Sequence, residues 1–399
     1  MKSSFLLKFC SLVCVSLFCV AYSSLLSDKG FTIEGKISDI EDGTVINLYR
    51  PDGNVLMVIA SDTVRNGCFT FREETISDPE QLSIIPQGDG FPPMFLNVWV
   101  ASGTKTTIKG KGKIHPVWEV ESSIAYQKEE NRYKNDNRDL IAESAKISLE
   151  RNNAFMKIMA VSSREESLPY RKIVDSLDLI SGALRIKQIF ANINVMEKTD
   201  VSPVWLDKMR GAAMELNSKA TNEHYDGLRN KVEALYKKMS EEDKNTPLGY
   251  HITSRLFPPP VVGVGDDMPD TDFFDINGNT KNLSDYMGKY LLLDFWSSGC
   301  GPCIMALPEM KEISETYIEK LTIISISLDT DTRWKAASAT HDMPWVNIRD
   351  PKAYGGLAAN YDVRGIPYYV IISPEGKVVD KWGGYGKGSL KRKVSENIK

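Results

Sequence analysis

The sequence is poor in the residue types that would build a metal site or a disulfide-stapled scaffold. It has 4 histidines among 399 residues, none of them clustered with cysteines or carboxylates, so we expect no dedicated metal site. Of its 6 cysteines only 3 lie beyond the N-terminal stretch over residues 1–23, too few for a framework of several disulfides. A net charge of -4 gives no reason to expect nucleic acid as a partner. The length predicts two or three domains of a globular protein.

A long hydrophobic run is also missing. Two lysines precede an apolar stretch over residues 9–22, which is shorter than the roughly 20 residues that a membrane-spanning helix needs. We predict that residues 1–23 are a secretory signal that is removed on export, which places the mature protein in the periplasm or another extracytoplasmic compartment. An uncleaved segment that tethers the chain to a membrane is the alternative. Only Cys68, Cys300 and Cys303 lie beyond this signal.

The remaining chain has three successive sequence patterns. Residues 24–118 contain short alternating stretches separated by Asp-Gly and Asn-Gly turns, which predict a small antiparallel β-sandwich or barrel. Residues 119–257 have few glycines and apolar residues at helical spacing, which predict four or five helices. Pro258 to Pro260 form a stiff connector, and residues 258–399 have an α/β pattern. The predicted fold class is therefore multi-domain, with an N-terminal antiparallel β domain, a central α-helical segment and a C-terminal α/β domain. Breaks between helices are expected near Pro169, Pro203 and Pro247.

Two cysteines, Cys300 and Cys303, are separated by Gly301 and Pro302 and follow a buried strand directly. A helix is predicted to start there, and its unpaired N–H groups and partial positive charge favour thiolate at its first cysteine. Because thiolate is the nucleophile, Cys300 is the candidate attacker, and Cys303 would resolve the mixed disulfide. A zinc knuckle would need two further ligands, and a structural bridge has no reason to occupy this junction. We interpret Cys68 as a small buried hydrophobe, with pairing to another chain as the alternative.

The stretch from Leu291 to Cys303 resembles the active-site segment of thioredoxins. Together with residues 264–270 and 277–283, it resembles the TlpA/ResA-like branch of the AhpC/TSA–redoxin type. Members of that branch are exported or membrane-tethered bacterial thiol–disulfide oxidoreductases. The resemblance covers about residues 262–399 and implies a thioredoxin-like fold for this domain. The N-terminal region resembles an unassigned β-plus-helical region that precedes such domains in some extracytoplasmic proteins, which implies no activity.

The resemblance also implies roles for individual residues. Asp294 matches a buried acid that could accept the proton from Cys303, and a buried Asp needs such a role or a close partner. Ile366 and Pro367 match a cis-proline loop whose backbone pairs with an extended substrate segment. No cofactor is expected beyond the redox-active Cys300–Cys303 disulfide. The implied substrate-binding residues are Trp296, Gly301, Pro302, Ile366 and Pro367.

One position departs from the family pattern. Ala306 stands where TlpA/ResA-like proteins often carry a glutamate, and Glu309 is too far along the helix to take that role. The narrow substrate specificity of the cytochrome-maturation members is therefore not expected. The Gly301-Pro302 dipeptide is that of the reducing members of the family.

We therefore expect an exported thiol–disulfide oxidoreductase that reduces or exchanges protein disulfides through Cys300 and Cys303 and contributes to redox homeostasis. Its partners would be protein disulfide substrates and a membrane electron donor. One alternative is a peptide- or partner-binding protein with a subsidiary redox domain. A thiol-dependent peroxidase is the other, although the Pro-x-x-x-Thr-x-x-Cys setting of such enzymes is missing.

Overall fold

A computed structural model describes residues 30–52, 55–216 and 227–398. The predicted signal over residues 1–23 lies outside these ranges. Among the helices described, none has the length and apolar character needed to cross a membrane.

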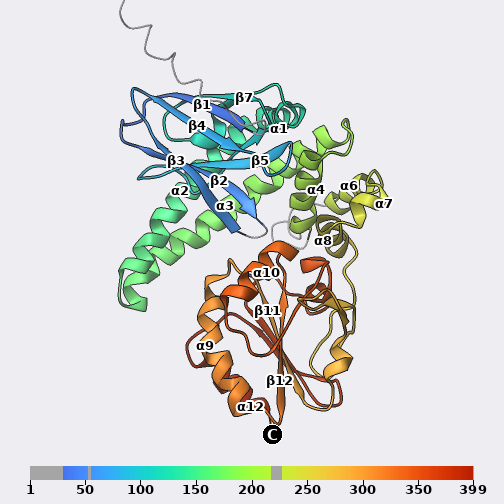
Figure 1. Ribbon diagram of the computed structural model, residues 1–399. Coiled ribbons are helices and arrows are strands. Elements are labelled where there is room, and N and C mark those ends of the chain that lie inside the picture. Colours follow the sequence, from blue (N-terminus) through green and yellow to red (C-terminus); the bar gives the residue numbers. More distant parts are fainter. Residues whose placement is uncertain (1–29, 53–54, 217–226, 399) are drawn as a thin grey trace, which may run out of the picture.

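Two four-stranded sheets form the N-terminal domain (Figure 1), with strand orders β4-β1-β7-β8 and β3-β2-β5-β6. Alternate residues of β1, such as Phe31 and Ile33, point into a shared core because side chains along a strand alternate between its faces. The predicted β domain is confirmed, although β1 and β7 pair in parallel. The strands are β1 (Gly30–Ser38), β2 (Val45–Asp52), β3 (Val55–Thr63), β4 (Cys68–Glu74), β5 (Glu80–Pro86), β6 (Leu96–Val100), β7 (Lys105–Lys111) and β8 (Glu119–Glu121).

Cys68 is exposed and unpaired, so its interpretation as a buried hydrophobe is wrong. The physical reason is its place in β4. Phe69 and Phe71 occupy the inward positions of this strand, and the residue before them points outward.

The central region is helical, as predicted, and the described part contains more helices than expected. Ser202 and Thr246 cap two of them, each with a proline at the first helical position, where the missing N–H is not needed. The break expected near Pro169 lies earlier, at Ser163, and Pro169 is inside α3. The helices are α1 (Ala125–Asp136), α2 (Arg138–Ala160), α3 (Arg164–Met196), α4 (Pro203–Glu215), α6 (Leu228–Tyr236), α7 (Glu241–Lys244) and α8 (Pro247–Leu256).

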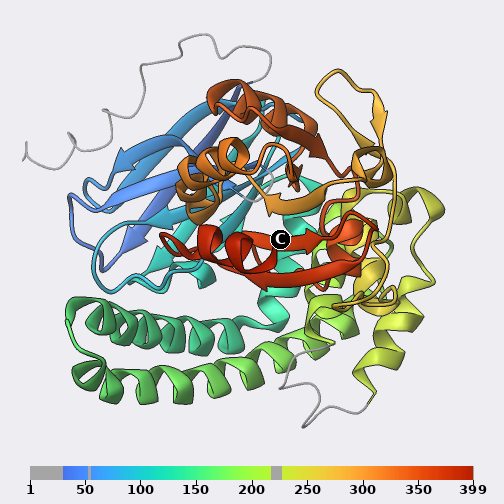
Figure 2. The same cartoon turned by 90° about the horizontal axis from the view of Figure 1, so that it is seen from below.

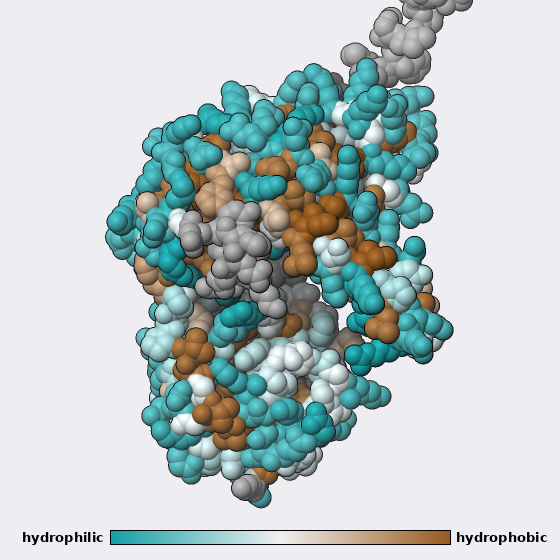
Figure 3. Space-filling view, turned by 180° about the vertical axis from the view of Figure 1, so that it is seen from behind, coloured by the Kyte–Doolittle hydropathy of each residue, from teal (hydrophilic) through white to brown (hydrophobic). Residues whose placement is uncertain are grey.

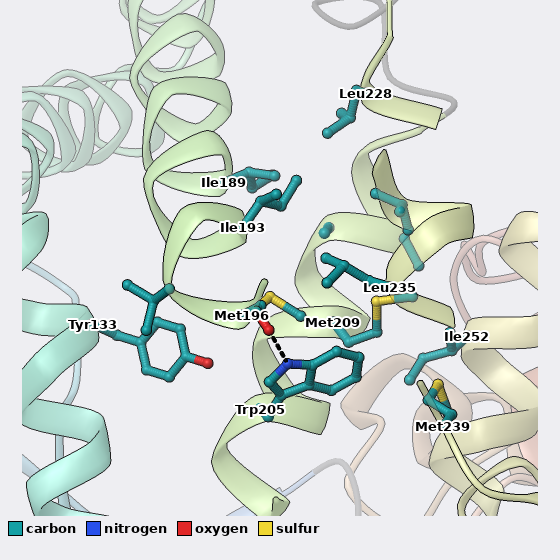
Figure 4. Packing of buried hydrophobic residues seen from close by; sticks show 14 of the residues in the cluster. Tyr133, Ile189, Ile193, Met196, Trp205, Met209, Leu228, Leu235, Met239 and Ile252 are labelled. Carbon is teal, nitrogen blue, oxygen red and sulfur yellow. Dashed lines mark hydrogen bonds between the residues drawn. The ribbon is translucent and has the colours of Figure 1, made fainter. Parts of the chain in front are cut away.

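This region has its own core, built around Trp205 (Figure 4). The indole is fully buried, and its Nε1 donates a hydrogen bond to the carbonyl oxygen of Met196 at 3.2 Å. Ile193 and Met209 pack around it, while Ile252 of α8 brings the last helix into the same cluster. The paired helices α2 and α3 extend from this core as a long hairpin (Figure 2).

The C-terminal domain is a thioredoxin-like α/β fold with the sheet order β10-β9-β13-β12-β11-β14-β15. Strands β11, β12 and β13 are parallel, and β14 and β15 are antiparallel to their neighbours. Helices α9 and α12 pack on one face of the sheet, and α11 on the other. The elements are β9 (Phe273–Phe274), β10 (Thr280–Lys281), η2 (Leu283–Tyr286), β11 (Tyr290–Trp296), α9 (Gly301–Thr316), β12 (Leu321–Ser327), α10 (Asp331–Thr340), β13 (Val346–Arg349), η3 (Ala353–Gly355), α11 (Leu357–Asn360), β14 (Tyr368–Ile372), β15 (Val378–Gly383) and α12 (Ser389–Asn397).

Helix α8 packs against η3 and joins the helical region to the C-terminal domain. A Cβ added at Gly355 would lie 2.4 Å from the carbonyl carbon of Tyr250, so the close approach of the two backbones requires glycine. His251 stacks on Tyr354 with ring centroids 5.7 Å apart. Seen from behind, the molecule has an upper lobe, formed by the N-terminal β domain and the helical region, and a lower lobe, formed by the C-terminal domain. The surface is hollowed between the two lobes (Figure 3).

Candidate active site

The two cysteines lie at the start of α9 and are joined by a disulfide, with their Cα atoms 5.2 Å apart. Cys300 is the N-cap residue, and its Sγ accepts a hydrogen bond from the backbone N–H of Cys303 at 3.2 Å. Cys303 is only 3% exposed, whereas Cys300 is half-buried. A thiolate at Cys300 would therefore be stabilised by the helix terminus and remain open to a partner, while Cys303 is enclosed.

The loop before Cys300 is held by side chains that follow the neighbouring strand β12. Asp329 is 3% exposed and accepts two hydrogen bonds of 2.7 Å, from the hydroxyl of Ser297 and from the backbone N–H of Ser298. Arg333 of α10 donates from Nε and from a terminal nitrogen to Ser298 Oγ, at 3.1 and 3.0 Å. These contacts fix the approach of the chain to Cys300.

The sequence analysis missed Ser297, Ser298, Asp329 and Arg333. A signal was available, because β11 and β12 are parallel and the residues that follow their carboxyl ends meet at one edge of the sheet. Asp329 follows β12 in the same way that the active-site loop follows β11.

Asp294 lies in β11 and is 2% exposed. Strand alternation places it on the same face as Leu292, which packs on Ala306 of α9, and Trp296, which packs on Cys303. The carboxyl group is therefore beneath the first turns of α9. Its Oδ2 accepts a hydrogen bond from Ser325 at 2.8 Å, and its Oδ1 has no hydrogen-bond partner among the described residues.

Burial is the main influence on the protonation of Asp294. It raises the pKa of the carboxyl group to about 7, against the smaller opposing effect of the Ser325 hydrogen bond. A group with this pKa can both take up and release a proton near neutral pH, which is the property required of a general acid or base.

The predicted cis-proline isomer is confirmed, since the peptide bond between Ile366 and Pro367 is cis. Ile366 packs against the small cluster that contains Trp296 and Cys303, and Cys300 packs against the same cluster. The structure thus brings the proline loop and the cysteine pair together.

The other predicted substrate contacts differ in accessibility. Gly301 and Pro302 are exposed, so both are open to a partner. Trp296 is only 1% exposed, and its indole forms part of the floor beneath the disulfide. Contact between Trp296 and a substrate stays a prediction that its position does not support.

Ala306, at the family's glutamate position, and Glu309, three residues further along α9, have clear structural roles. Ala306 is fully buried against the sheet. Glu309 is 7% exposed and accepts hydrogen bonds from the hydroxyl of Tyr385 and from the backbone N–H groups of Gly388 and Lys391, at 3.0, 2.9 and 2.7 Å. Burial would raise the pKa of Glu309, yet these hydrogen bonds hold it below its usual value. Glu309 therefore anchors the start of α12.

Within the described ranges, no group of three or more His, Cys, Asp or Glu side chains is arranged to hold a metal ion.

Comparison with known proteins gives a consistent family assignment for this domain. Residues 264–381 match the AhpC/TSA family. The thiol–disulfide oxidoreductase ResA of Bacillus cereus (strain ATCC 10987 / NRS 248) is 30% identical over 123 residues, which are 30% of this chain and 70% of that protein. The chain belongs to the thioredoxin superfamily. The thioredoxin-like protein YneN of Bacillus subtilis (strain 168) is 28% identical over 125 residues, 30% of this chain and 72% of the relative. These relatives support an oxidoreductase activity at the family level.

A solved structure also resembles this part of the chain. The crystal structure of a putative thiol:disulfide interchange protein DsbE from Chlorobium tepidum shares 28% sequence identity, with a TM-score of 0.32. The match covers 34% of this chain and 97% of that chain.

Proposed function

We propose that the protein is an exported thiol–disulfide oxidoreductase that reduces or exchanges disulfides in other proteins. The observation that carries this proposal is the asymmetry of the cysteine pair. Cys300 is half-buried at a helix start, and Cys303 is almost completely buried beside it. An attacking thiolate needs the first environment, and an internal resolving thiol is protected by the second.

The reaction begins with both cysteines reduced, Cys303 as a thiol and Cys300 as a thiolate whose proton has passed to solvent, from which the first released substrate sulfur takes up its proton. The Cys300 thiolate attacks one sulfur of a substrate disulfide, forms a mixed disulfide and releases the other substrate sulfur as a thiolate. Cys303 then loses its proton to the Asp294 carboxylate and attacks Cys300 Sγ, which frees the second substrate sulfur. The substrate has gained two electrons and two protons, the second of them from Asp294 through solvent, and the protein is left in the disulfide form seen here.

The cycle needs an external dithiol to return the protein to its reduced form. Outside the cytoplasm, a membrane protein that relays electrons from cytoplasmic thiols would supply it. The substrate would bind through an extended segment alongside the backbone of Ile366, with Gly301 and Pro302 at the same surface.

Trapping tests this function directly. In a Cys303→Ala variant, Cys300 can attack but cannot be resolved, so mixed disulfides with substrate proteins should accumulate in extracytoplasmic extracts. The matched control is Cys300→Ala, which retains the buried thiol of Cys303 and the exposed thiol of Cys68 and should capture none of the partners that depend on Cys300.

A reduced full-length chain should also reduce insulin in the presence of dithiothreitol, with both variants inactive. The proposal fails if wild-type protein with a reactive Cys300 neither reduces insulin nor, as Cys303→Ala, captures any partner. A partner-binding protein with a subsidiary redox domain would then be the better account.

A further inference from the structure

A side chain of the thioredoxin-like domain contacts the N-terminal β domain next to the active site. The Arg333 guanidinium that donates to Ser298 Oγ also places a terminal nitrogen 3.6 Å from Met57 Sδ. Met57 belongs to β3, 276 positions away in the sequence. Arg333 therefore touches both the N-terminal domain and the loop residue two positions before Cys300.

The orientation of the domains makes this contact part of the surroundings of the active site. Helices α9 and α10 both begin at the edge of the sheet where β11 and β12 end. The paired strands β2 (Val45–Asp52) and β3 (Val55–Thr63), called the β2–β3 hairpin below, extend toward α10 at that edge (Figure 1). On another side, α8 is packed against η3, with Gly355 in contact with the backbone of Tyr250. Two separate contacts thus hold the upper lobe over the active-site edge of the lower lobe.

The contact has a chemical consequence for substrates. Thiol–disulfide exchange requires the attacking sulfur to reach a substrate sulfur directly, so access to Cys300 limits the reaction. A side chain of the upper lobe close to the loop before Cys300 leaves less room on that side than an isolated thioredoxin-like domain would have. Met57 is 50% exposed, so part of this apolar side chain remains available to an incoming polypeptide.

We propose that the β2–β3 hairpin is a specificity element of the active site, and that Met57 and Arg333 narrow the approach to Cys300 so that flexible, extended disulfide-containing segments react in preference to disulfides on folded proteins. This inference rests on the proposed function. In this proposal, the Met57 side chain forms one side of the path by which a substrate reaches Cys300. Arg333 is a positioning residue, because it holds Met57 and the loop before Cys300 together.

The test compares three disulfide substrates with the reduced full-length chain. They are oxidised glutathione, an unstructured peptide closed by one disulfide, and insulin as a folded protein. Met57→Ala should raise the rate on insulin relative to glutathione by roughly fivefold, the change expected when an obstruction of about 1 kcal/mol is removed. The ratio of the peptide rate to the glutathione rate should change much less, because a flexible segment already fits.

Val58→Ala is the matched control. Val58 is the next residue of β3, is 52% exposed and points to the opposite face of the strand, so its truncation should leave the insulin-to-glutathione ratio within about twofold. Circular dichroism and thermal unfolding would establish that both variants are folded.

A second substitution tests the positioning role. Arg333→Ala should increase the insulin-to-glutathione ratio as Met57→Ala does, mainly through a lower KM for insulin. Arg333→Lys, which keeps a donor for Ser298 without the planar fork of arginine, should give an intermediate ratio. A purely structural role would instead reduce the rates on all three substrates together.

The two proposals fail in different ways. If wild-type protein reduces none of the three substrates, the proposed function itself is wrong. If it reduces glutathione and the peptide, but neither Met57→Ala nor Arg333→Ala changes the insulin-to-glutathione ratio more than Val58→Ala, the hairpin is no specificity element and the oxidoreductase function stands.

Discussion

Replacing Asp294 with asparagine is expected to remove part of the pH dependence of stability in the thioredoxin-like domain. Asp294 is 2% exposed, and burial raises its pKa to about 7 from an ordinary value of 3.8. A carboxyl group with a raised folded-state pKa holds its proton more tightly in the folded chain than in the unfolded chain. The folded state therefore loses stability as the pH rises from about 4 to about 7, and the loss persists at higher pH.

The magnitude follows from the two pKa values. They differ by about 3 units, and each unit is worth ~1.4 kcal/mol, so the charged carboxyl costs about 4 kcal/mol of stability above pH ~7. Asparagine remains neutral and avoids this cost, and its carbonyl can still accept the hydrogen bond from Ser325. Its amide nitrogen would take the place of Oδ1, which has no partner among the described residues, at a cost of ~1–3 kcal/mol at every pH.

These two effects predict a crossover. The Asp294→Asn variant should be less stable than wild type near pH ~4 and more stable above pH ~7, with a total change in the difference of about 4 kcal/mol. Pulse proteolysis in urea at several pH values can measure this, because each protected fragment reports the folded fraction of its own domain.

Ser325→Ala provides a control for the assignment. Loss of the hydroxyl donor removes a hydrogen bond to the charged form of Asp294, so the pH range over which stability falls should move upward. A stability difference between Asp294→Asn and wild type that stays the same from pH ~4 to pH ~8 would refute the reasoning, because it would show that the carboxyl group has no raised pKa.

Three further predictions concern the supports of the site. Glu309→Ala should destabilise the docking of α12 by about 2–4 kcal/mol, because the three hydrogen bonds that the buried carboxylate accepts are lost. Faster hydrogen exchange of the α12 amides would measure this loss, and unchanged exchange would contradict the prediction. Gly355→Ala should separate α8 from η3, because the new Cβ would overlap the backbone of Tyr250; faster proteolysis of the connector at residues 258–260 is the expected result. Trp205→Phe should lower the free energy of unfolding of the helical region by about 1–3 kcal/mol, because the indole hydrogen bond to Met196 is lost, and should leave the thioredoxin-like domain unchanged. An equal loss of stability in the thioredoxin-like domain on urea unfolding would argue against independent cores.

The elements with strong periodicity could be predicted from the sequence. The buried strand before the cysteines, the helix after them and the β-to-helical change near residue 120 all depend on local patterns, and the structure has them. The parallel pairing of β1 with β7 could not be predicted in this way, because strands so far apart in sequence pair according to the tertiary packing of two sheets. Cys68 was misplaced for a related reason, since which face of β4 is buried depends on the core that Phe69 and Phe71 enter.

The residues of the candidate site also differ in whether a local sequence pattern can predict them. Cys300, Cys303 and the cis bond before Pro367 are carried by contiguous motifs, which a sequence displays directly. Asp329 and Arg333 are brought to the active-site loop only because parallel strands end at one edge of the sheet, so locating them requires a prediction of strand order.

The contact between Met57 and Arg333 was the least predictable feature from the sequence. An exposed methionine in an edge strand has no motif, and an arginine near the start of a surface helix is ordinary. Their meeting depends on how α8 and η3 orient the N-terminal region relative to the C-terminal domain, because Met57 and Arg333 come from these two parts of the chain. If Met57 and Arg333 narrow the approach to Cys300 as proposed, domain orientation decides substrate specificity together with the cysteine motif, and related thioredoxin-like domains without this N-terminal region should accept a broader range of folded disulfide substrates.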